Sequence, residues 1–544
     1  NQDFPYNAMC PEDPASGGSY SGRVPVGCVA TAMSQIMQYW RYPEMGQGSH
    51  CISPIQPQYG QQCADFGNTT YEWSGMTDNP TKECDPVALL AWHCGISVNM
   101  EYAASGSGAY TSTVASALKT YFKYASSAYS AQKYSYSTAQ WSNMVKGDLD
   151  AGRPIEYSGS GAGGGHAWVC DGYQGTDSYH MNWGWGGAYN GYFTLNSLTP
   201  GGSNFSSQQA GIFNIQPNTS MYPPYCAGQS DLLTYDFGAL DDGSGPVADY
   251  ENNTNCSWLI APDDAVAYVT LSFVSFDLAT GDELNIYDGS SASATLLGTY
   301  SGSALPPNVS STGPEMFVTF TSNESGTAQG FLAEYNCNLI SFCASSTELN
   351  DASGDISDGS ETYDYRNSSM CKWYIKPTNA NSVILDFNSL NTEETNDKIQ
   401  VYDLGTGTLL GTYSGDMTNP PTGITASSGE MLVMWSTNKT VRGIGWDASY
   451  SITVGTEESA AVDHLYVYPN PAHDFLMVKF DGTELGTVQL DLYSLKGTKI
   501  YSDVRLNVNG QVEERISLSG VSKGIYMLRI ASEKGVSNTK VIVQ

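Results

Sequence analysis

Residues 27–37 read GCVATAMSQIM, and this stretch decides how the first part of the chain folds. Its apolar residues recur at spacings of three and four, which is the pattern of an amphipathic helix, and Pro43 ends the pattern. We therefore expect a helix over residues 28–41 that begins at Cys28. The helix dipole and the free backbone N–H groups at this end favour a thiolate and can hold an oxyanion. From this pattern alone, it is equally possible that Cys28 is a small buried side chain or half of a disulfide.

A second stretch, residues 163–173, reads GGGHAWVCDGY and places His166 between a glycine run and an apolar segment. The apolar segment predicts a buried strand, and the glycines allow a substrate backbone to approach closely. A lone histidine is usually structural, but the motif YHMNWGWGG of residues 179–187 follows at the distance of one hairpin. The amide oxygen of Asn182 could accept a hydrogen bond from the imidazole and fix its tautomer, while a neighbouring indole shields that bond.

Together these motifs resemble the streptopain (interpain-like) family of cysteine peptidases, which have a papain-like fold. They occur in the family's order within residues 1–216. The resemblance implies that Cys28 is the nucleophile and that His166 is the general base and acid. It also implies that Asn182 and Trp183 orient the imidazole.

The same resemblance implies part of a substrate cleft. Ser107 and Gly165 match cleft-lining positions of the family, and Trp185 is expected either in a cleft wall or in the aromatic core. The family has a glutamine eight residues before the histidine, where this chain has Ser158. We therefore expect backbone N–H groups, with that of Cys28 first among them, to hold the oxyanion.

Helical patterns precede strand patterns in this part of the chain. Helices are expected over residues 28–41, 86–93, 112–124 and 140–151. Strands are expected over residues 155–157, 166–171, 178–183, 191–195 and 211–215. This order predicts an α+β domain with two lobes and a cleft between them. His93, on the second helix, is expected to be a structural histidine.

The middle of the chain contains an internal repeat, in which residues 226–334 match residues 343–452. Short alternating strands at regular spacing predict a β-sandwich for each copy. The motifs CSW and DELNIYDG in the first copy, and their counterparts in the second, resemble CUB domains. Each copy is thus expected to be a CUB-like domain.

Some CUB domains bind Ca²⁺ through a Glu, an Asp and a later Asp or Asn, which are hard oxygen ligands. In the second copy, the resemblance assigns these positions to Glu393, Asp397 and Asn438. The first copy retains Asp282 and Asn323 but has Ala279 near the position expected for the Glu. Solvated loop carboxylates are the alternative interpretation of both sets.

The last part of the chain, residues 464–544, contains the motif YPNPA at residues 468–472 and a late strand pattern, GIYMLRI, at residues 524–530. These features predict a small β-sandwich and resemble the C-terminal sorting domain of the type IX secretion system. The resemblance implies transport by the type IX machinery across the outer membrane of a Bacteroidota-type bacterium. Removal of the tail and attachment to surface lipopolysaccharide often follow in such proteins.

The cysteines suggest an exported protein. The expected disulfides are Cys226–Cys256 and Cys343–Cys371, which recur in the repeat, and Cys51–Cys63. Cys94 and Cys170 are expected to be buried thiols, and Cys10, Cys84 and Cys337 stay unassigned.

The chain is acidic, with 23 Lys and Arg residues against 55 Asp and Glu residues and a net charge of −32. Most of the excess lies in residues 218–455, and it argues against binding to nucleic acid or to anionic membranes. No apolar run approaches the ~20 residues of a membrane span. We expect that a signal peptide and a propeptide were removed before residue 1.

The sequence as a whole predicts a papain-like α+β domain at residues 1–217, CUB-like sandwiches at 218–338 and 339–455, and a sorting domain at 456–544. The expected function is a secreted or surface-held cysteine endopeptidase that cleaves proteins or peptides and needs no cofactor for catalysis. The alternative is an adhesin in which an inactive peptidase scaffold presents the sandwiches to a host protein.

Overall fold

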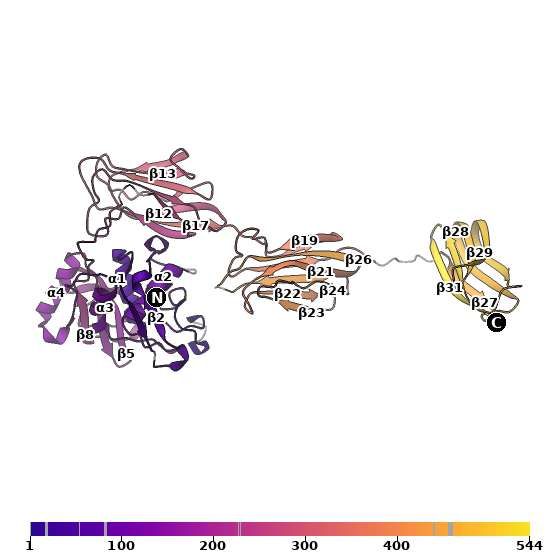
Figure 1. Cartoon of the computed structure of the whole chain (residues 1–544), viewed down its shortest axis with the longest axis horizontal. Coiled ribbons are helices and arrows are strands. Elements are labelled where there is room, and N and C mark those ends of the chain that lie inside the picture. Colours follow the sequence, from indigo (N-terminus) through magenta and orange to yellow (C-terminus); the bar gives the residue numbers. More distant parts are fainter. Residues whose placement is uncertain are drawn as a thin grey trace.

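The computed structural model describes the whole chain except residues 1, 17–19, 54, 81–83, 227, 229, 439–440 and 455–460, and the side chains of residues 483–484. An N-terminal unit combines helices with a sheet, and the rest of the chain is built from strands (Figure 1). The sequence also predicts a linker at residues 454–463, and most of that segment lies outside the described residues. None of the described helices is long and apolar enough to cross a membrane.

The described residues of the N-terminal unit form four α-helices and a six-stranded antiparallel sheet with the strand order β3-β8-β4-β5-β6-β7. The helices are α1 (Cys28–Trp40), α2 (Asp85–Ser97), α3 (Val114–Tyr121) and α4 (Thr138–Asp150). The strands of the sheet are β3 (Tyr129–Gln132), β4 (Ile155–Gly161), β5 (Gly164–Gln174), β6 (Ser178–Asn182), β7 (Gly191–Phe193) and β8 (Ser207–Phe213). A separate hairpin joins β1 (Ser49–Ile52) to β2 (Gln62–Asp65).

The sheet separates two hydrophobic cores. On one face, the buried side chains of α1, α2 and α3 pack against Ala167, Val169 and Ile212 of the sheet. On the other face, an aromatic cluster includes Trp168 of β5 and Trp141 of α4. Alternate residues of β5 therefore enter different cores, as the two-residue period of a strand requires.

The predicted helices are present, with shifted ends. The third begins later than expected, because Thr111–Thr113 forms a 3-10 turn and α3 starts at Val114. The fourth begins at Thr138, where Ser137 and Gln140 form a capping box that satisfies free backbone groups at the helix start. The short strands β1, β2 and β3 were not predicted, because their sequences are polar and lack a clear alternation.

The first sandwich follows the N-terminal unit and consists of two sheets around one core. One sheet has the order β14-β13-β16-β11-β9, and the other β10-β17-β12-β15. The strands are β9 (Ser230–Leu233), β10 (Phe237–Asp241), β11 (Asn255–Ile260), β12 (Val266–Asp277), β13 (Glu283–Asp288), β14 (Thr295–Tyr300), β15 (Val309–Ser310), β16 (Met316–Thr321) and β17 (Gly330–Leu339).

The second sandwich repeats this topology strand for strand, which confirms the internal repeat. Its sheets have the orders β23-β22-β25-β20-β18 and β19-β26-β21-β24 around a separate core. The strands are β18 (Thr347–Leu349), β19 (Ser353–Ser357), β20 (Met370–Ile375), β21 (Ala380–Asn391), β22 (Lys398–Asp403), β23 (Thr408–Tyr413), β24 (Ile424–Ala426), β25 (Met431–Ser436) and β26 (Gly445–Val454).

The C-terminal unit packs five strands around its own core. Two of its strands are unusually long, and they pair with each other over most of their length. The strands are β27 (Asp463–Tyr468), β28 (Phe475–Ser494), β29 (Lys499–Ser517), β30 (Gly524–Ser532) and β31 (Gly535–Val543).

The three predicted disulfides are confirmed: Cys51–Cys63 between β1 and β2, Cys226–Cys256 in the first sandwich and Cys343–Cys371 in the second. Cys94 and Cys170 are buried thiols, as expected.

Ion pairs connect the first three units in chain order. Arg41, at the end of α1, contacts Asp241 of the first sandwich at 2.7 Å. Asp264 of the first sandwich accepts contacts from two arginines of the second, Arg366 at 3.0 Å and Arg442 at 2.9 Å. These pairs couple each sandwich to the unit that precedes it.

Candidate active site

The predicted nucleophile lies at the start of a helix. Cys28 is the first residue of α1, and Gly27 before it has a φ of 93°, a conformation that favours glycine. A Cβ atom on Gly27 would lie 2.6 Å from Met100 Sδ and 3.1 Å from the carbonyl oxygen of Ser107. The glycine thus lets the chain turn into α1 while it passes close to two neighbouring segments.

The thiol of Cys28 lies against strand β5. Its contacts include the backbone N–H groups of Ala167, Val29 and Cys28 itself, which favour the thiolate. Burial has the larger effect, and together with the charge of Glu156 it raises the pKa of Cys28 above its ordinary value. The N–H groups at the helix start therefore stabilise the thiolate, as expected. Their effect on the pKa is smaller than the effect of burial, which removes solvent from the sulfur.

His166 lies in β5 directly before Ala167, so the strand that contacts the sulfur also carries the imidazole. His166 Nε2 is 2.9 Å from the carbonyl oxygen of Trp183. A carbonyl can only accept, so Nε2 carries the proton and donates it, which leaves the lone pair on Nδ1. Nδ1 is thus the ring atom that can take up a proton. Burial lowers the pKa of His166, and the bond to the carbonyl partly opposes this.

Aromatic rings surround the imidazole. Trp185 stacks on it with a centroid distance of 4.9 Å, and Trp183 is nearly parallel to it at 6.4 Å. Phe205 and Trp168 lie at 5.2 and 6.0 Å. These rings leave His166 only 9% exposed, which explains why burial governs its pKa.

The amide oxygen of Asn182 was expected to bind the imidazole, but it binds a backbone N–H group instead. Its Oδ1 accepts a hydrogen bond from Gly184 N at 3.2 Å, while the Trp183 carbonyl is the atom that binds His166. The reason is the strand register, because Asn182 pairs with Val169, whose side chain enters the core opposite to the aromatic cluster. Asn182 therefore holds the N–H end of the Trp183–Gly184 peptide group, whose C=O end holds the imidazole.

A second asparagine supports the same segment. The side chain of Asn190 accepts a hydrogen bond from Trp183 N at 3.0 Å. The peptide groups on both sides of Trp183 are thus fixed by asparagine side chains. This arrangement orients the carbonyl oxygen that His166 requires.

The predicted cleft residues lie near these groups. Ser107 is buried, its Oγ accepts from Ala103 N at 3.4 Å, and its carbonyl oxygen approaches Gly27. Gly165 is exposed at the start of β5, paired with Ser160. Trp185 is half-buried and belongs to the wall of rings around His166.

Sequence reasoning missed several neighbours of the site. Phe205 and Trp168 contribute to the aromatic wall, and Glu156 is fully buried behind the nucleophile helix. A signal for Glu156 was present, since it is a lone carboxylate in a strand pattern that reads as buried. His93, by contrast, is structural as predicted: it is buried, and its Nδ1 lies 2.9 Å from Tyr71 Oη.

The predicted Ca²⁺ ligands of the second sandwich lie together. Asn438 donates from its side chain to Glu393 Oε2 at 2.6 Å and from its backbone to Asp397 Oδ1 at 2.7 Å. Tyr365 Oη donates to Asp397 Oδ2 at 2.6 Å. No group of three or more His, Cys, Asp and Glu side chains suited to a metal occurs among the described residues. A cation here would need the amide oxygen of Asn438 besides the two carboxylates.

The first sandwich contains the same network without the glutamate. Tyr250 Oη donates to Asp282 Oδ2 at 2.5 Å, and Asn323 N donates to Asp282 Oδ1 at 2.7 Å. Ala279 contributes only its backbone N–H, to Tyr250 Oη. This site therefore has one carboxylate where the second sandwich has two.

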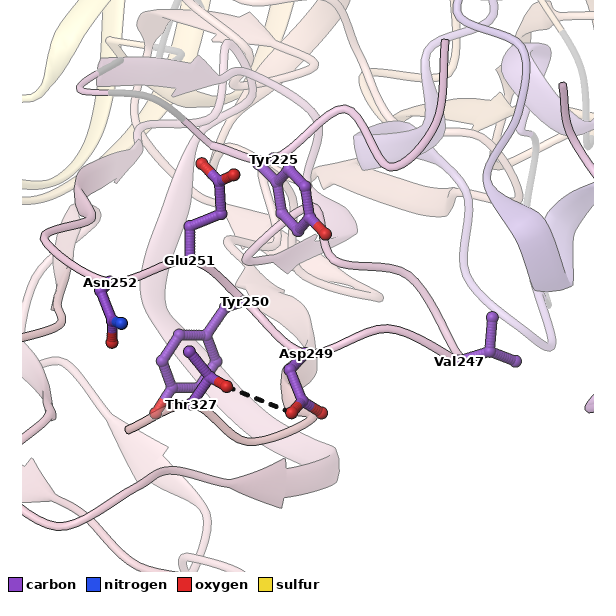
Figure 2. Close-up of a pocket in the computed structure, with 7 residues that line it drawn as sticks. All are labelled: Tyr225, Val247, Asp249, Tyr250, Glu251, Asn252 and Thr327. Carbon is purple, nitrogen blue, oxygen red and sulfur yellow. Dashed lines mark hydrogen bonds between the residues drawn. The ribbon is translucent and has the colours of Figure 1, made fainter. Parts of the chain in front are cut away.

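A pocket of about 790 Å³ also lies in the first sandwich, next to this network (Figure 2). Asp249, Glu251 and Tyr225 contribute polar groups to its wall, and Thr327 donates to Asp249 at 3.2 Å. None of the predicted catalytic residues lines it. It is thus separate from the site around Cys28.

Comparison with known families divides the chain into matched segments. Residues 1–193 match the peptidase C10 family, residues 226–335 and 343–450 each match the CUB domain, and residues 466–544 match a secretion system C-terminal sorting domain. The segments agree with the motifs from which each resemblance was inferred.

Three relatives are each similar to about 40% of this chain. The thiol protease/hemagglutinin PrtT of Porphyromonas gingivalis is 33% identical over 236 residues, which is 41% of this chain and 26% of that protein. Streptopain of Streptococcus pyogenes is 33% identical over 240 residues, 40% of this chain and 60% of that protein. The structure of active Prevotella intermedia interpain A cysteine protease is 36% identical, with 39% of this chain and 89% of that chain covered and a TM-score of 0.36.

The chain thus spans about a quarter of one of these curated relatives and 60% of the other. The peptidase C10 family model covers the segment that carries Cys28, His166 and Trp183. Residues 1–193 of this chain therefore match a family of cysteine peptidases, and matches to two CUB domains and a C-terminal sorting domain follow them.

Proposed function

We propose that the protein is an exported cysteine endopeptidase in which Cys28 and His166 form the catalytic pair. The observation that carries this proposal is the junction of α1 and β5: the sulfur contacts the backbone N–H of Ala167, the residue after His166. The imidazole is at the same time held through Nε2, so its other nitrogen is available as a base.

The reaction begins with proton transfer from Cys28 to His166 Nδ1. Burial favours the neutral thiol and the neutral imidazole over two separate ions, so the ion pair depends on the mutual attraction of its charges. The thiolate then attacks the scissile carbonyl carbon and forms a tetrahedral intermediate. Backbone N–H groups at the start of α1, including that of Cys28, hold its oxyanion.

The intermediate collapses when the imidazolium gives its proton to the leaving amine, which breaks the peptide bond and leaves an acyl group on Cys28. His166 then takes a proton from a water molecule, and the hydroxide releases the acyl group. Trp183 supports both steps, because its carbonyl oxygen stabilises the positive charge on the imidazolium. Asn182 supports that carbonyl through the shared peptide group. Ser107, Gly165 and Trp185 line the adjoining substrate cleft in this proposal.

The direct test is peptide cleavage by the purified full-length chain and by its Cys28→Ala and His166→Ala variants. Both variants should fold and fail to cleave a mixed peptide library. Cleavage by either variant at close to the wild-type rate would reject the catalytic pair.

Labelling with a thiol-reactive peptide electrophile separates this proposal from the adhesin alternative. An active site should react fast and at Cys28 alone, because the peptide portion brings the electrophile into the cleft. Equal modification of Cys28 and the other thiols would favour a binding protein on an inactive scaffold.

We also propose the division of the chain into a catalytic domain (residues 1–217), two CUB-like domains (218–338 and 339–455) and a sorting domain (456–544). The sorting domain supports export by the type IX secretion machinery to the outer surface or the medium of a Bacteroidota bacterium, with attachment to surface lipopolysaccharide as one fate. Detection of residues 456–544 in the exported protein would show whether the tail is removed.

For the second sandwich we propose a Ca²⁺ site formed by Glu393, Asp397 and Asn438. Two carboxylates and an amide oxygen are the hard donors that Ca²⁺ prefers, and burial raises the pKa of Asp397, so a cation would offset an unfavourable charge. Titration with Ca²⁺ should raise the melting temperature of the wild type but not of Glu393→Gln. Equal shifts in both would exclude this ligand set.

A further inference from the structure

Glu156 is a buried acid that the catalytic mechanism does not use. It lies in β4 with 0% exposure, and neither carboxyl oxygen has a hydrogen-bond partner among the described residues. Its cross-strand neighbours are Val169 of β5 and Ile212 of β8, both apolar. A buried polar group without a partner is rare in folded proteins and calls for a specific explanation.

The position of Glu156 relative to the nucleophile follows from the strand register. Glu156 is directly opposite Val169, and Ala167 is two residues from Val169 on the same face of β5. Such diagonal neighbours are about 7–8 Å apart, within reach of a long side chain. Since Ala167 N–H contacts the Cys28 sulfur, the carboxyl group lies in the same core as the thiol.

The charge of Glu156 has its clearest effect on two thiols. It raises the pKa of Cys28 on α1 and that of Cys94 on α2. From the adjacent strands it is faced by Val169 and Ile212, which carry no charge. His166 points into the aromatic cluster on the other face of the sheet, and burial and the Trp183 carbonyl account for its shift. Glu156 itself has its pKa raised by burial, so the neutral acid is its favoured form.

We propose that Glu156 is a positioning residue for Cys28. When the Glu156 carboxyl group is protonated, the Cys28 thiolate can form, and when the carboxyl group is ionised, its charge destabilises the thiolate. Loss of the Glu156 proton would then reduce the fraction of reactive thiolate, although nothing has changed at His166. This inference rests on the proposed function for its biological meaning, but its test does not require peptide cleavage.

The test is the rate of Cys28 alkylation by iodoacetamide between pH 5 and pH 9, in the full-length wild type and in Glu156→Gln. Cleavage by trypsin after Arg23 and Arg41 gives the peptide of residues 24–41, in which Cys28 is the only cysteine, so mass spectrometry reports this thiol alone. The variant should react faster than the wild type by about threefold to tenfold at the alkaline end, which corresponds to an apparent thiol pKa lower by about half a unit to one unit.

A second variant distinguishes charge from packing. Glu156→Met removes the charge and fills a similar volume, so it should shift the alkylation profile in the same direction as Glu156→Gln. If Glu156 only filled space, the two variants would differ from each other or would leave the profile unchanged.

Asp242→Asn is the matched control. Asp242 is a buried carboxyl in the first sandwich, and burial raises its pKa to about 6, while the groups that act on it, Ser244, Asp241 and Phe331, all belong to that sandwich. This variant should leave the profile of Cys28 unchanged. Superimposable profiles for wild type and Glu156→Gln at every pH, or slower alkylation in the variant, would overturn the proposal. If instead Cys28→Ala retained peptidase activity, the proposed function would fail while this electrostatic result still stood.

Discussion

The two faces of the N-terminal sheet give the two residues of the proposed catalytic pair different surroundings. Cys28 lies on the side of the helical core, which also holds the buried acid Glu156, whose charge raises the pKa of the thiol. His166 lies on the other side among aromatic rings, and its bound nitrogen has a neutral backbone partner. In our proposal, the charge of Glu156 acts on the thiol from one face, while on the other face the aromatic rings exclude water from the imidazole. The comparison teaches that a single strand, β5, can expose adjacent residues to two different environments.

The largest effects should come from the pair itself. Cys28→Ala should reduce kcat/KM to background, and His166→Ala should reduce it by about 10²- to 10⁴-fold, because it removes general acid–base catalysis. Steady-state cleavage of a fluorogenic peptide measures both. A circular dichroism spectrum like that of the wild type is the control for correct folding. A loss of kcat/KM below tenfold in either variant would contradict the assignment of a catalytic role to the residue on that face.

The next effect concerns the stability of the helical face. The raised pKa of Glu156 means that its contribution to stability is fully present below the pKa of an unfolded Glu, about 4.3, and is lost as pH rises through the folded pKa. Between these values the wild type should lose about 1.4 kcal/mol per pH unit relative to Glu156→Gln.

This difference can be measured in a Cys28→Ala background, which prevents self-cleavage. Hydrogen exchange of peptides from β4, compared between the two variants at equal pH, reports the local stability. If the difference in local stability between the chains with Glu156 and with Gln at this position did not grow with pH, Glu156 would be ionised in the folded chain.

A smaller effect should follow from opening the aromatic face. Trp185→Ala exposes the imidazole, so the pKa of His166 should rise towards its ordinary value and the acid limb of the kcat/KM profile should move to higher pH. Near pH 6 we expect kcat/KM to fall by about twofold to tenfold, which corresponds to the free energy of one aromatic contact. Trp185→Phe retains a ring and should stay close to wild type. An unchanged acid limb in Trp185→Ala would show that the other rings suffice.

The smallest effect should come from Asn182. Asn182→Ala removes one hydrogen bond to the peptide group that holds His166, so we expect about a fivefold loss of kcat/KM. Asn190→Ala removes the corresponding bond on the other side of Trp183 and should have a similar effect. A loss above about 100-fold in Asn182→Ala alone would indicate a direct contact with the imidazole during catalysis.

Much of the fold could be predicted from local patterns. The helix that begins at Cys28 follows from its apolar spacing and from Pro43, and the disulfides Cys226–Cys256 and Cys343–Cys371 follow from their equivalent places in the repeat. The hairpin at Cys51 was missed as secondary structure although its disulfide was predicted, because polar residues give such short strands little pattern.

The details of the site were less predictable. The partner of His166 is a backbone carbonyl, and a backbone group leaves no signature in the sequence. The side chain of Asn182 was expected at that position because its residue type suits the role. Its pairing with Val169 directs it elsewhere, and strand register of this kind depends on long-range pairing.

Gly27 has a consequence for anyone who wishes to redesign this enzyme. Since the chain turns there at a φ of 93°, with Met100 and Ser107 pressed against it, no larger residue fits before the nucleophile. A library that varies the residues around Cys28 should return a single survivor at residue 27, whatever substrate is used for selection. Directed evolution of cleavage preference must therefore vary residues other than Gly27.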